Sequence, residues 1–338
     1  MIEREELTLP NFEQLFADIE NLRVAVVGDV MLDTYWWGTV DRISPEAPVP
    51  VVSLQKKEYR IGGAGNVALN TVSLGAETTL FSIVGEDEDA EQLLSMLQEE
   101  HIDTKYIVRS SKRITTNKIR VMGQHHQMMR IDAEVTSDIS KEEEDELLSS
   151  FESFVKRYEP GVVVFEDYNK GVLTESLISS IMAICKEHRI ITAADPKHKN
   201  FFAYKGVTIF KPVLKEALEH SPALMSQETT EEHLQQLHAQ LHHHLQHKIS
   251  LISLPSFNLF FQKGNYAKTI AMHTHNIADV SGCEDTIIAV AALVYTTEKD
   301  MVLAASLASL AAGIVCAHVG TVAINKQQLM EECRKSLN

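Results

Sequence analysis

The stretch Asp279-Val-Ser-Gly-Cys-Glu-Asp-Thr286, followed by the apolar run of residues 287–294, decides the fold. The run predicts a buried helix, and it places Asp285 on the first turn of that helix, just after Gly282. The first turn of a helix leaves backbone N–H groups without acceptors, and such groups bind phosphate. The stretch therefore predicts a helix start at which an aspartate can act as a base beside a phosphate.

The composition is that of an acidic globular protein. The chain has 338 residues, of which 44% are hydrophobic and 23% charged, so it is long enough for one large core. Its formal net charge of -16 argues against nucleic acid and anionic membranes as main partners, because both bind cationic surfaces. A local basic pocket for a phosphorylated small molecule remains compatible with this charge.

The cysteines and the N-terminus favour a reducing cytoplasm. The acidic N-terminus lacks the basic and apolar segments of a secretion signal. No Cys-x-x-Cys spacing is present, which argues against a disulfide framework and against structural zinc. The cysteines are Cys185, Cys283, Cys316 and Cys333.

Residues 301–325 carry no formal charge and raise the question of a membrane span. The run is rich in Ala and Ser and contains Gly313, His318 and Gly320. Such small residues are typical of helices that pack closely inside a protein, so we expect a buried helix here.

Short β-branched runs alternate with helical patterns along the chain. Runs at residues 22–27, 79–84, 161–165, 190–194, 207–210 and 249–252 read as buried strands. This alternation predicts a doubly wound α/β core with a mostly parallel sheet and helices on both faces. Residues 33–59 and 112–134 break the rhythm with antiparallel patterns, and we expect them to form a small β-sheet lid on a single domain.

The helix predicted at residues 231–247 is rich in Gln and His. His238 with His242, and His243 with His247, have the i, i+4 spacing that can bind a metal on a helix face. No carboxylate joins them in a catalytic pattern. A solvated helix face is therefore the favoured interpretation.

Two polar groups lie where an open α/β sheet binds its ligands. Asp29 and Asp33 follow the first strand, and carboxylates at that edge suit vicinal sugar hydroxyls. The Gly-rich run at residues 61–68 lets the backbone approach a ligand closely, and it contains Asn66. The run lacks the Lys-Ser/Thr ending of a phosphate-binding P-loop.

Together these motifs resemble the D-glycero-D-manno-heptose 7-phosphate kinase branch of the PfkB/ribokinase superfamily. The similar segments are residues 28–38, 42–50, 62–70, 167–171, 195–197 and 311–315, and the resemblance extends over residues 24–329. The segment Arg42-Ile-Ser-Pro-Glu-Ala-Pro-Val-Pro50 is specific to the heptose kinase branch. The resemblance implies a ribokinase-like fold. Bifunctional relatives add an adenylyltransferase domain, which we do not expect in these 338 residues.

The resemblance assigns residues to a sugar-phosphate pocket. Lys170 and Lys197 match positions near the phosphate groups. Arg42 and Glu46 come from the lid, and Arg130 and Asp132 match the family's lid strand. The others bind the sugar hydroxyls or line the floor of the pocket. The complete set is Asp29, Asp33, Arg42, Glu46, Gly62, Gly63, Asn66, Arg130, Asp132, Lys170 and Lys197.

On the catalytic side, the resemblance implies that Asp285 deprotonates the acceptor hydroxyl. The N–H groups of Gly282, Cys283 and Glu284 would form an anion hole for the transferring phosphate. The family closes with Gly-Ala-Gly-Asp, so Cys283 and Glu284 are departures. Glu tolerates fewer backbone conformations than Gly, and its carboxylate can occupy the same N–H groups and repel a nucleotide.

The nucleotide side is implied to include Asp195, Glu216, Ser253 and Asn258. The family's Pro-Asn-x-x-Glu motif organises the magnesium shell. Here it reads Pro212-Val-Leu-Lys-Glu216, so only Glu216 is left to hold Mg²⁺ through water. Asn258 stands where the family's nucleotide loop has glycine.

Two main hypotheses therefore remain open. In the first, the protein is a kinase that transfers the γ-phosphate of Mg-ATP to the anomeric hydroxyl of a heptose 7-phosphate or similar sugar phosphate. In the second, it is a pseudokinase that binds a sugar phosphate without transferring phosphate, as a sensor or a partner. A third, weaker interpretation keeps catalysis with an unusual nucleotide or phosphate donor held by altered contacts. The resemblance also implies a homodimer formed through the lid, where Tyr35-Trp-Trp37 supplies aromatic residues typical of interfaces. An apolar patch over the substrate would explain these residues equally well.

Overall fold

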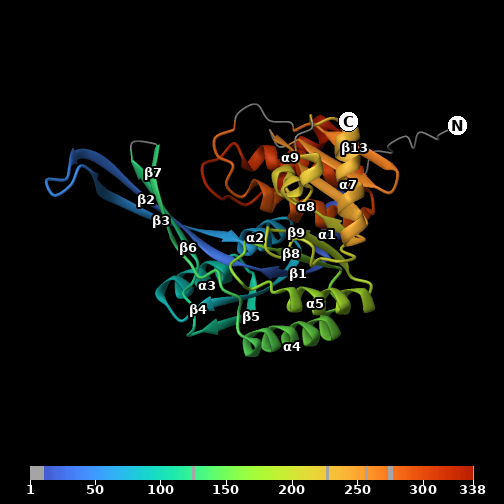
Figure 1. Cartoon of the computed structure of the whole chain (residues 1–338), viewed down its shortest axis with the longest axis horizontal. Helices are drawn as coiled ribbons and strands as arrows, with labels where there is room; N and C mark the ends of the chain where they lie inside the picture. Colours follow the sequence, from blue (N-terminus) through green and yellow to red (C-terminus); the bar gives the residue numbers. More distant parts are fainter. Residues whose placement is uncertain (1–10, 124–125, 226–227, 256–257, 273–276, 338) are drawn as a thin grey trace.

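The structure is a computed structural model, and it describes residues 11–123, 126–225, 228–255, 258–272 and 277–337. Figure 1 shows a central sheet between two helical layers, with a second, smaller sheet projecting to one side. This layered arrangement confirms the predicted α/β class.

The larger sheet has the strand order β13-β12-β11-β10-β9-β8-β1-β4-β5. Neighbours are parallel from β5 to β11, while β12 and β13 add an antiparallel edge. The strands are β1 (Arg23–Gly28), β4 (Glu77–Gly85), β5 (Asp103–Ser110), β8 (Val162–Glu166), β9 (Ile191–Asp195), β10 (Ile209–Phe210), β11 (Ile249–Ser253), β12 (Leu259–Lys263) and β13 (Tyr266–Ile270). All six strands predicted from buried runs are confirmed, and β5, β12 and β13 were not predicted.

Each face of this sheet is buried by its own set of helices, so that the strand interiors are apolar on both sides. One face packs against α1 (Phe12–Glu20), α2 (Ala64–Ser73), α3 (Glu88–Glu99), α8 (Cys283–Glu298), α9 (Met301–Val315) and α10 (Lys326–Ser336). The other packs against α4 (Lys141–Tyr158), α5 (Glu175–Glu187), α6 (Leu214–Glu219) and α7 (Glu231–Leu245). A short 3₁₀ helix spans Pro222–Leu224.

The smaller sheet, here called the lid, has the order β3-β2-β6-β7. It consists of β2 (Val30–Ile43), β3 (Pro50–Gly63), β6 (Asn117–Gly123) and β7 (His126–Ala133). The segments predicted as a lid lie in this sheet, although β2 begins earlier and β3 ends later than expected. The bases of β2 and β3 are buried against the core, whereas the hairpin between them extends far from it (Figure 1).

The uncharged run near the C-terminus is confirmed as a buried helix over residues 301–315, whereas residues 316–325 are not helical. Most residues of α9 are buried in the core, including Gly313. No helix within the described ranges is long and apolar enough to cross a membrane.

The histidine-rich segment corrects one expectation, because His238 of α7 and His247, two residues beyond the end of α7, are buried rather than solvated. The hydroxyl of Ser250 lies 2.9 Å from Nδ1 of His238 and 2.6 Å from Nε2 of His247. A stripe of leucines at helical spacing turns this face of α7 toward the core. Within the described part of the chain, no group of three His, Cys, Asp or Glu side chains could hold a metal ion.

The cysteines correct a second expectation. Cys283 and Cys316 form a disulfide, with their Cα atoms 6.1 Å apart. The disulfide joins the first residue of α8 to the residue that follows α9. The distance between the two cysteines along the chain does not reveal that the fold brings them together. Cys185 and Cys333 are buried free thiols.

Candidate active site

Helix α8 begins at a glycine that no other residue can replace without strain. Gly282 is the N-cap with a φ of 78°, in the left-handed region that favours glycine. A Cβ placed on it would lie 2.6 Å from the side-chain nitrogen of Asn66. This turn brings the first residues of α8 to the carboxyl-end edge of the parallel strands, where open α/β sheets bind ligands.

Asp285 is the buried carboxylate at this helix start and is only 1% exposed. Its Oδ2 accepts a hydrogen bond from Asn66 at 2.7 Å, and its Oδ1 accepts one from the hydroxyl of Tyr168 at 2.8 Å. Burial raises the pKa of Asp285 to about 6, against the opposing effect of these two donors. The group is therefore an oriented carboxylate that is ionised at neutral pH and can be protonated in mild acid.

Asp29 and Asp33 do not have the same surroundings. Asp29 accepts backbone N–H groups of Tyr168, Lys170 and Val172 at 2.8–3.1 Å, so its carboxylate fixes the loop after β8. Burial raises the pKa of Asp29. Asp33 pairs instead with the guanidinium of Arg120, a residue that the sequence analysis did not single out.

The glycine-rich run brings β3 close to these carboxylates. A Cβ on Gly62 would lie 2.5 Å from Oδ2 of Asp33, and Gly63 has a φ of 57°. Asn66 follows on the first turn of α2 and reaches Asp285. The run therefore joins the predicted sugar-binding residues to the predicted base.

Four predicted sugar-side residues lie on the lid, two in the long hairpin and two on β7. Arg42 and Glu46 are exposed, at the end of β2 and in the β2–β3 hairpin, the part of the lid farthest from the core (Figure 1). Arg130 and Asp132 of β7 pair with each other at 2.8 and 3.0 Å. The structure thus does not bring Arg42 and Glu46 to the pocket, because the long hairpin carries them outward.

Two predicted lysines and a third lie near Tyr168. The ammonium of Lys197 is 5.4 Å from the centre of the Tyr168 ring, and that of Lys118 is 5.9 Å from it. Lys170 is paired with Glu134 at 2.8 Å. Burial lowers the pKa of Lys118, and the neighbouring charge of Lys170 lowers it further. Three ammonium groups therefore lie at this end of the site, two of them paired with carboxylates, Lys170 with Glu134 and Lys197 with Glu216.

On the opposite side, Lys211 connects the predicted nucleotide residues. It follows β10, is 0% exposed, and pairs with Asp195 and with Oε2 of Glu284, the latter at 2.7 Å. Burial lowers the pKa of Lys211, but the charges of Asp195 and Glu284 outweigh it and raise the pKa above its usual value. Ser253 completes the group by donating to Oε2 of Glu284 at 2.6 Å.

These contacts correct two expectations about Glu284. It lies within α8, and the left-handed residue is Gly282, so Glu284 does not strain the turn. Its carboxylate is bound to Lys211 and Ser253 rather than to the helix N–H groups. One N–H of the predicted anion hole is nevertheless occupied, because Cys283 donates to the carbonyl of Val280 at 3.3 Å.

Glu166, at the end of β8, is a buried carboxyl that the sequence analysis missed. It is 0% exposed, and neither of its oxygens has a hydrogen-bond partner among the described residues. Burial, followed by the charges of Asp195 and Asp285, raises its pKa well above the usual value. These neighbours place Glu166 between the base and the Lys211 group.

Both carboxylate oxygens of Glu216, the residue predicted to hold Mg²⁺ through water, have partners within the chain. Oε2 of Glu216 accepts the N–H of Val213 at 3.0 Å, and Oε1 lies 2.9 Å from the ammonium of Lys197. Magnesium prefers carboxylate and water oxygens in an octahedral shell. Such oxygens remain nearby, because Oδ1 of Asp195 and both oxygens of Glu166 are buried without a hydrogen-bond partner among the described residues.

Asn258, predicted on the nucleotide side, accepts the N–H of Met272 at 3.0 Å and does not line the cavity described next.

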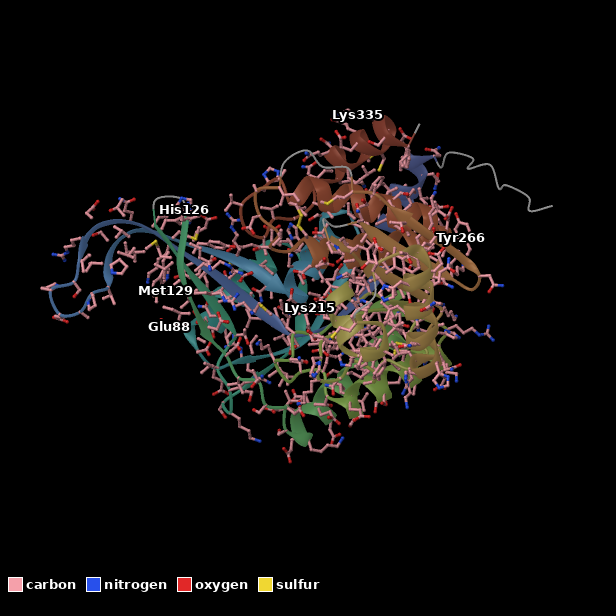
Figure 2. All side chains as sticks on the ribbon, turned by 45° about the horizontal axis from the view of Figure 1, so that its top comes forward. Glu88, His126, Met129, Lys215, Tyr266 and Lys335 are labelled. Atoms are coloured by element: carbon pink, nitrogen blue, oxygen red, sulfur yellow. A yellow bond between two sulfur atoms is a disulfide. The ribbon has the colours of Figure 1, made fainter. Side chains whose placement is uncertain are left out.

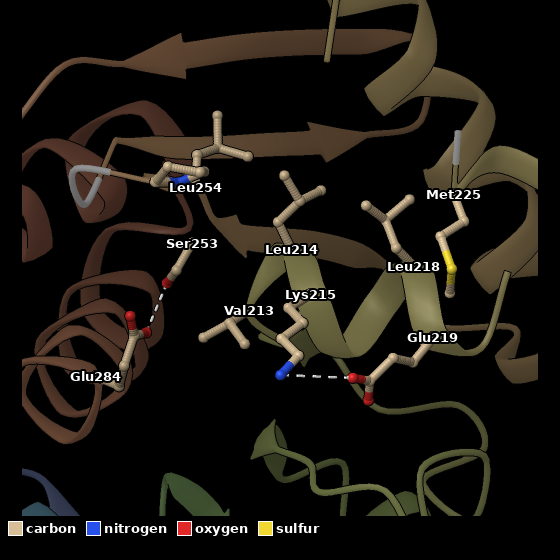
Figure 3. A pocket seen from close by; sticks show the side chains of 10 residues that line it. Val213, Leu214, Lys215, Leu218, Glu219, Met225, Ser253, Leu254 and Glu284 are labelled. Atoms are coloured by element: carbon tan, nitrogen blue, oxygen red, sulfur yellow. Dashed lines mark hydrogen bonds and ion pairs between the residues drawn. The ribbon is translucent and has the colours of Figure 1, made fainter. Parts of the chain in front are cut away.

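An apolar cavity of about 500 Å³ opens beside Glu284 (Figure 3). Figure 3 shows Ser253 and Glu284 at one end and Leu218 and Met225 at the other. The lining residues are Val213, Leu214, Lys215, Leu218, Glu219, Met225, Ser253, Leu254, Pro255 and Glu284. The cavity is large enough for a ligand with an apolar ring system.

The match to a family model decides the classification. Residues 21–328 match the model of the pfkB family of carbohydrate kinases. The chain belongs to the pfkB carbohydrate kinase family. This pfkB chain is 37% identical over 309 residues to the bifunctional protein HldE of Methylobacillus flagellatus, covering 91% of this chain and 62% of that protein. It is 34% identical over 326 residues to HldE of Geobacter metallireducens, covering 95% and 64%.

The chain thus spans less than two thirds of the length of these relatives. Among solved structures, its fold is similar to Arabidopsis thaliana ribokinase complexed with ribose and ATP, with a TM-score of 0.72 and 16% identity over 92% of this chain and 98% of that one. It is also similar to Escherichia coli phosphofructokinase-2 in complex with potassium, with a TM-score of 0.74 and 16% identity over 92% and 97%. The predicted ribokinase-like fold and the resemblance to the heptose kinase branch are confirmed.

Proposed function

We propose that this chain binds a sugar phosphate, a heptose 7-phosphate or a close relative, and transfers the γ-phosphate of ATP to its anomeric hydroxyl. The observation that carries the proposal is the buried Asp285 at the start of α8, oriented by Asn66 and Tyr168. A carboxylate with a pKa of about 6 is ionised at neutral pH and accepts the proton of an attacking hydroxyl.

The charge distribution supports an anionic acceptor. Lys118 and Lys197 flank the ring of Tyr168, and Lys170 lies nearby, in a chain whose net charge is -16. Local positive charge of this kind attracts a phosphate group and holds it beside the base. The remaining predicted contacts, from Asp33, Gly62 and Asn66, would then orient the sugar ring. A cytoplasmic location, where ATP and sugar phosphates occur, belongs to the same proposal.

A second candidate function is binding of the sugar phosphate without phosphate transfer. The observation that favours it is the pair between Lys211 and Glu284, which puts a carboxylate beside the predicted anion hole. That carboxylate repels the phosphates of a nucleotide unless it is displaced. The two candidates share the sugar pocket and differ only on the nucleotide side.

Titration calorimetry and a transfer assay separate the two candidates. Heptose 7-phosphate and ATP are titrated separately into the full chain, and formation of the bisphosphate is then followed. The kinase proposal expects binding of both ligands and turnover on the order of 1–100 per second. Sugar-phosphate binding without turnover supports the second candidate. Failure of heptose 7-phosphate and related sugar phosphates to bind contradicts both.

We further propose that the lid pairs with the lid of a second copy. Apolar side chains are exposed on it, and Figure 2 labels one of them, Met129 of β7, which is 57% exposed. Ile43 and Leu54 of the long hairpin are also exposed, whereas Tyr35 is buried and cannot supply the contact expected from it. Light scattering of the wild type and of Met129→Glu tests the pairing. A monomeric wild type at micromolar concentration contradicts it.

A further inference from the structure

The disulfide between Cys283 and Cys316 lies at the start of α8, and Cys283 is two residues before the proposed base. We propose that this bond is a reversible redox switch, whose reduction by a dithiol displaces Asp285 and lowers phosphate transfer. The inference rests on the proposed function, which assigns Asp285 as the base and the cytoplasm as the location. Disulfides in reducing compartments are usually transient and serve catalysis or redox sensing, so a sensing role suits a bond at this position.

The bond joins two segments that both shape the start of α8. Cys283 is the first residue of α8, and its N–H is one of those in the predicted anion hole. Cys316 follows α9, and its carbonyl accepts the N–H groups of Ala278 and Asp279 at 2.8 and 3.2 Å. The disulfide therefore fixes the first turn of α8 against the segment that also holds the residues leading into that turn.

The segment after α9 also connects α8 to the lid. Arg60 of β3 donates to the carbonyls of Val319 and Thr321, the latter at 3.3 Å. A Cβ on Gly282 would lie 3.1 Å from Cγ2 of Thr321, so this threonine packs against the N-cap of α8. A displacement of this segment is therefore passed both to the N-cap of α8 and to the lid.

Reduction of the bond is a balanced exchange of two electrons and two protons. A thiolate of the dithiol attacks one sulfur of the bond, which forms a mixed disulfide and releases the other cysteine as a thiol. The second thiol of the reductant then attacks the mixed disulfide, releases the remaining cysteine and leaves the reductant as a disulfide. The reverse exchange with the oxidised reductant closes the bond again.

Opening the bond needs space that the folded chain does not provide. Both cysteines are 0% exposed, and two free sulfurs lie farther apart than two bonded ones. Cys283 therefore moves away from Cys316 and takes the first turn of α8 with it. Asp285 lies on that turn, and such a shift lengthens its hydrogen bonds of 2.7 and 2.8 Å to Asn66 and Tyr168.

The bond is buried but lies under surface loops. Val280 and Val319, each three residues from one of the two cysteines, have exposed fractions of 54% and 46%. A local opening of these loops admits a small dithiol without unfolding of the core.

The other two cysteines differ from this pair. Cys185 in α5 and Cys333 in α10 are buried free thiols, and burial raises the pKa of each to about 12. A thiol that stays protonated is a poor nucleophile, so these two do not take part in the exchange. They serve as controls.

Thiol counting and hydrogen exchange test the switch without any need for catalysis. The wild-type chain is equilibrated with defined ratios of reduced to oxidised dithiothreitol, denatured, alkylated and weighed by mass spectrometry. We expect two thiols in the oxidised chain and four in the reduced one. We expect the amides of residues 278–285 and 316–321 to exchange at least about tenfold faster after reduction. The amides of α4, on the other face of the sheet, should exchange at an unchanged rate.

The link to the site is measured on the same samples. We expect kcat to fall at least about tenfold on reduction and to return on reoxidation, because a misplacement of about 1 Å can cost about 10²-fold. The affinity for heptose 7-phosphate should stay unchanged, since Asp33 and Gly62 lie on lid strands and not on α8. Cys316→Ala should behave as the reduced wild type in every buffer. Cys185→Ala is the control and should respond as the wild type does.

The inference is overturned by a chain that keeps four thiols in every buffer. It is also overturned if reduction leaves hydrogen exchange at the start of α8 or kcat unchanged, or if reduction unfolds the whole chain, because the bond is then a structural cross-link. If Cys316→Ala does not fold, the comparison of the oxidised and reduced wild type still decides. Absence of turnover in both states contradicts the kinase proposal alone, because hydrogen exchange measures the switch independently.

Discussion

The hydroxyl of Tyr168 donates a hydrogen bond to Oδ1 of Asp285 at 2.8 Å, while the ring of the same tyrosine lies 5.4 Å from the ammonium of Lys197. One side chain therefore contacts both the proposed base and the proposed phosphate-binding charges. Burial and the neighbouring charge of Asp285 raise the pKa of Tyr168 well above its usual value, so the phenol stays a donor. The position of the base thus depends on a residue of the loop after β8.

Replacement of Tyr168 by Phe is expected to shift the pH profile of activity. The Tyr168 hydroxyl lowers the pKa of Asp285, so its loss raises that pKa above about 6. The acid limb of kcat/KM then moves to higher pH. The control is Tyr204→Phe, which removes a hydroxyl from Asp167 instead. An acid limb that stays in place in Tyr168→Phe contradicts the assignment of Asp285 as the titrating base.

Replacement of Asp285 by Asn is expected to lower kcat by about 10²–10⁴-fold, the usual contribution of a general base. The amide keeps the size of the carboxylate and can still contact Asn66 and Tyr168. Calorimetry should therefore show an unchanged affinity for the sugar phosphate. A variant that keeps more than half of the wild-type kcat would show that another group takes the proton.

Replacement of Glu284 by Gly is expected to raise the affinity for ATP by about tenfold, measured in the presence of a chelator. The change removes one negative charge and leaves Lys211 paired with Asp195, so that its ammonium can bind a phosphate oxygen. The control is Glu219→Gln, because Glu219 lines the same cavity. Val213→Asn alone should have no effect without metal. Equal ATP affinity in the wild type and Glu284→Gly would remove Glu284 as the obstacle.

The free energy of unfolding is expected to fall by about 3–5 kcal/mol in Lys211→Met, because the buried Asp195 and the partly exposed Glu284 lose their common partner. Glu284→Gln should cost less, since Lys211 keeps Asp195 and the amide can still accept from Ser253. Urea denaturation of the three chains measures both values. A smaller loss for Lys211→Met than for Glu284→Gln would show that the ammonium is not the centre of the group.

Acid is expected to destabilise the protein through its buried histidines. Burial lowers the pKa of His238 from 6.5 to about 4 and that of His247 from 6.5 to about 3. As the pH falls, the unfolded chain therefore protonates these two histidines before the folded chain does. The stability that comes from burying them uncharged is fully present above pH 6.5 and is lost as the pH falls toward 4 and 3. Thermal melting from pH 8 to 4 measures the loss.

The control for the acid effect is a variant of an exposed histidine. His243→Gln on the solvent side of α7 should melt like the wild type at every pH. His238→Gln should flatten the decline of the melting temperature between pH 6.5 and 4, because one of the protons is no longer taken up. An unchanged decline in His238→Gln would assign the acid sensitivity to other groups.

Most of the fold could be predicted because the parallel strands are buried on both faces. Their β-branched runs are therefore continuous and easy to find. The antiparallel edge strands β12 and β13 were missed, since only the first three residues of β12 are buried and every residue of β13 is partly buried or exposed. The burial of His238 was also missed, although Leu234 and Leu241 at helical spacing place it on the apolar face of α7.

The sequence predicted only those residues of the candidate site that belong to a local sequence pattern. Gly282 and the apolar run after it predict the position of Asp285, and the glycine-rich run predicts Asn66. Lys211 has no such pattern, because a single lysine after Phe210 gives no sign of being buried. Its partners Asp195 and Glu284 are distant along the chain, and only the folded sheet brings them together.

The interlocked charges at Lys211 also restrict the order in which these residues can be substituted. Loss of Lys211 alone would leave the buried Asp195 and the partly exposed Glu284 without their common partner, at a cost of about 3–5 kcal/mol. Loss of Glu284 alone leaves Lys211 paired with Asp195. An attempt to redesign this side of the site should therefore begin at the glutamate and leave the lysine in place.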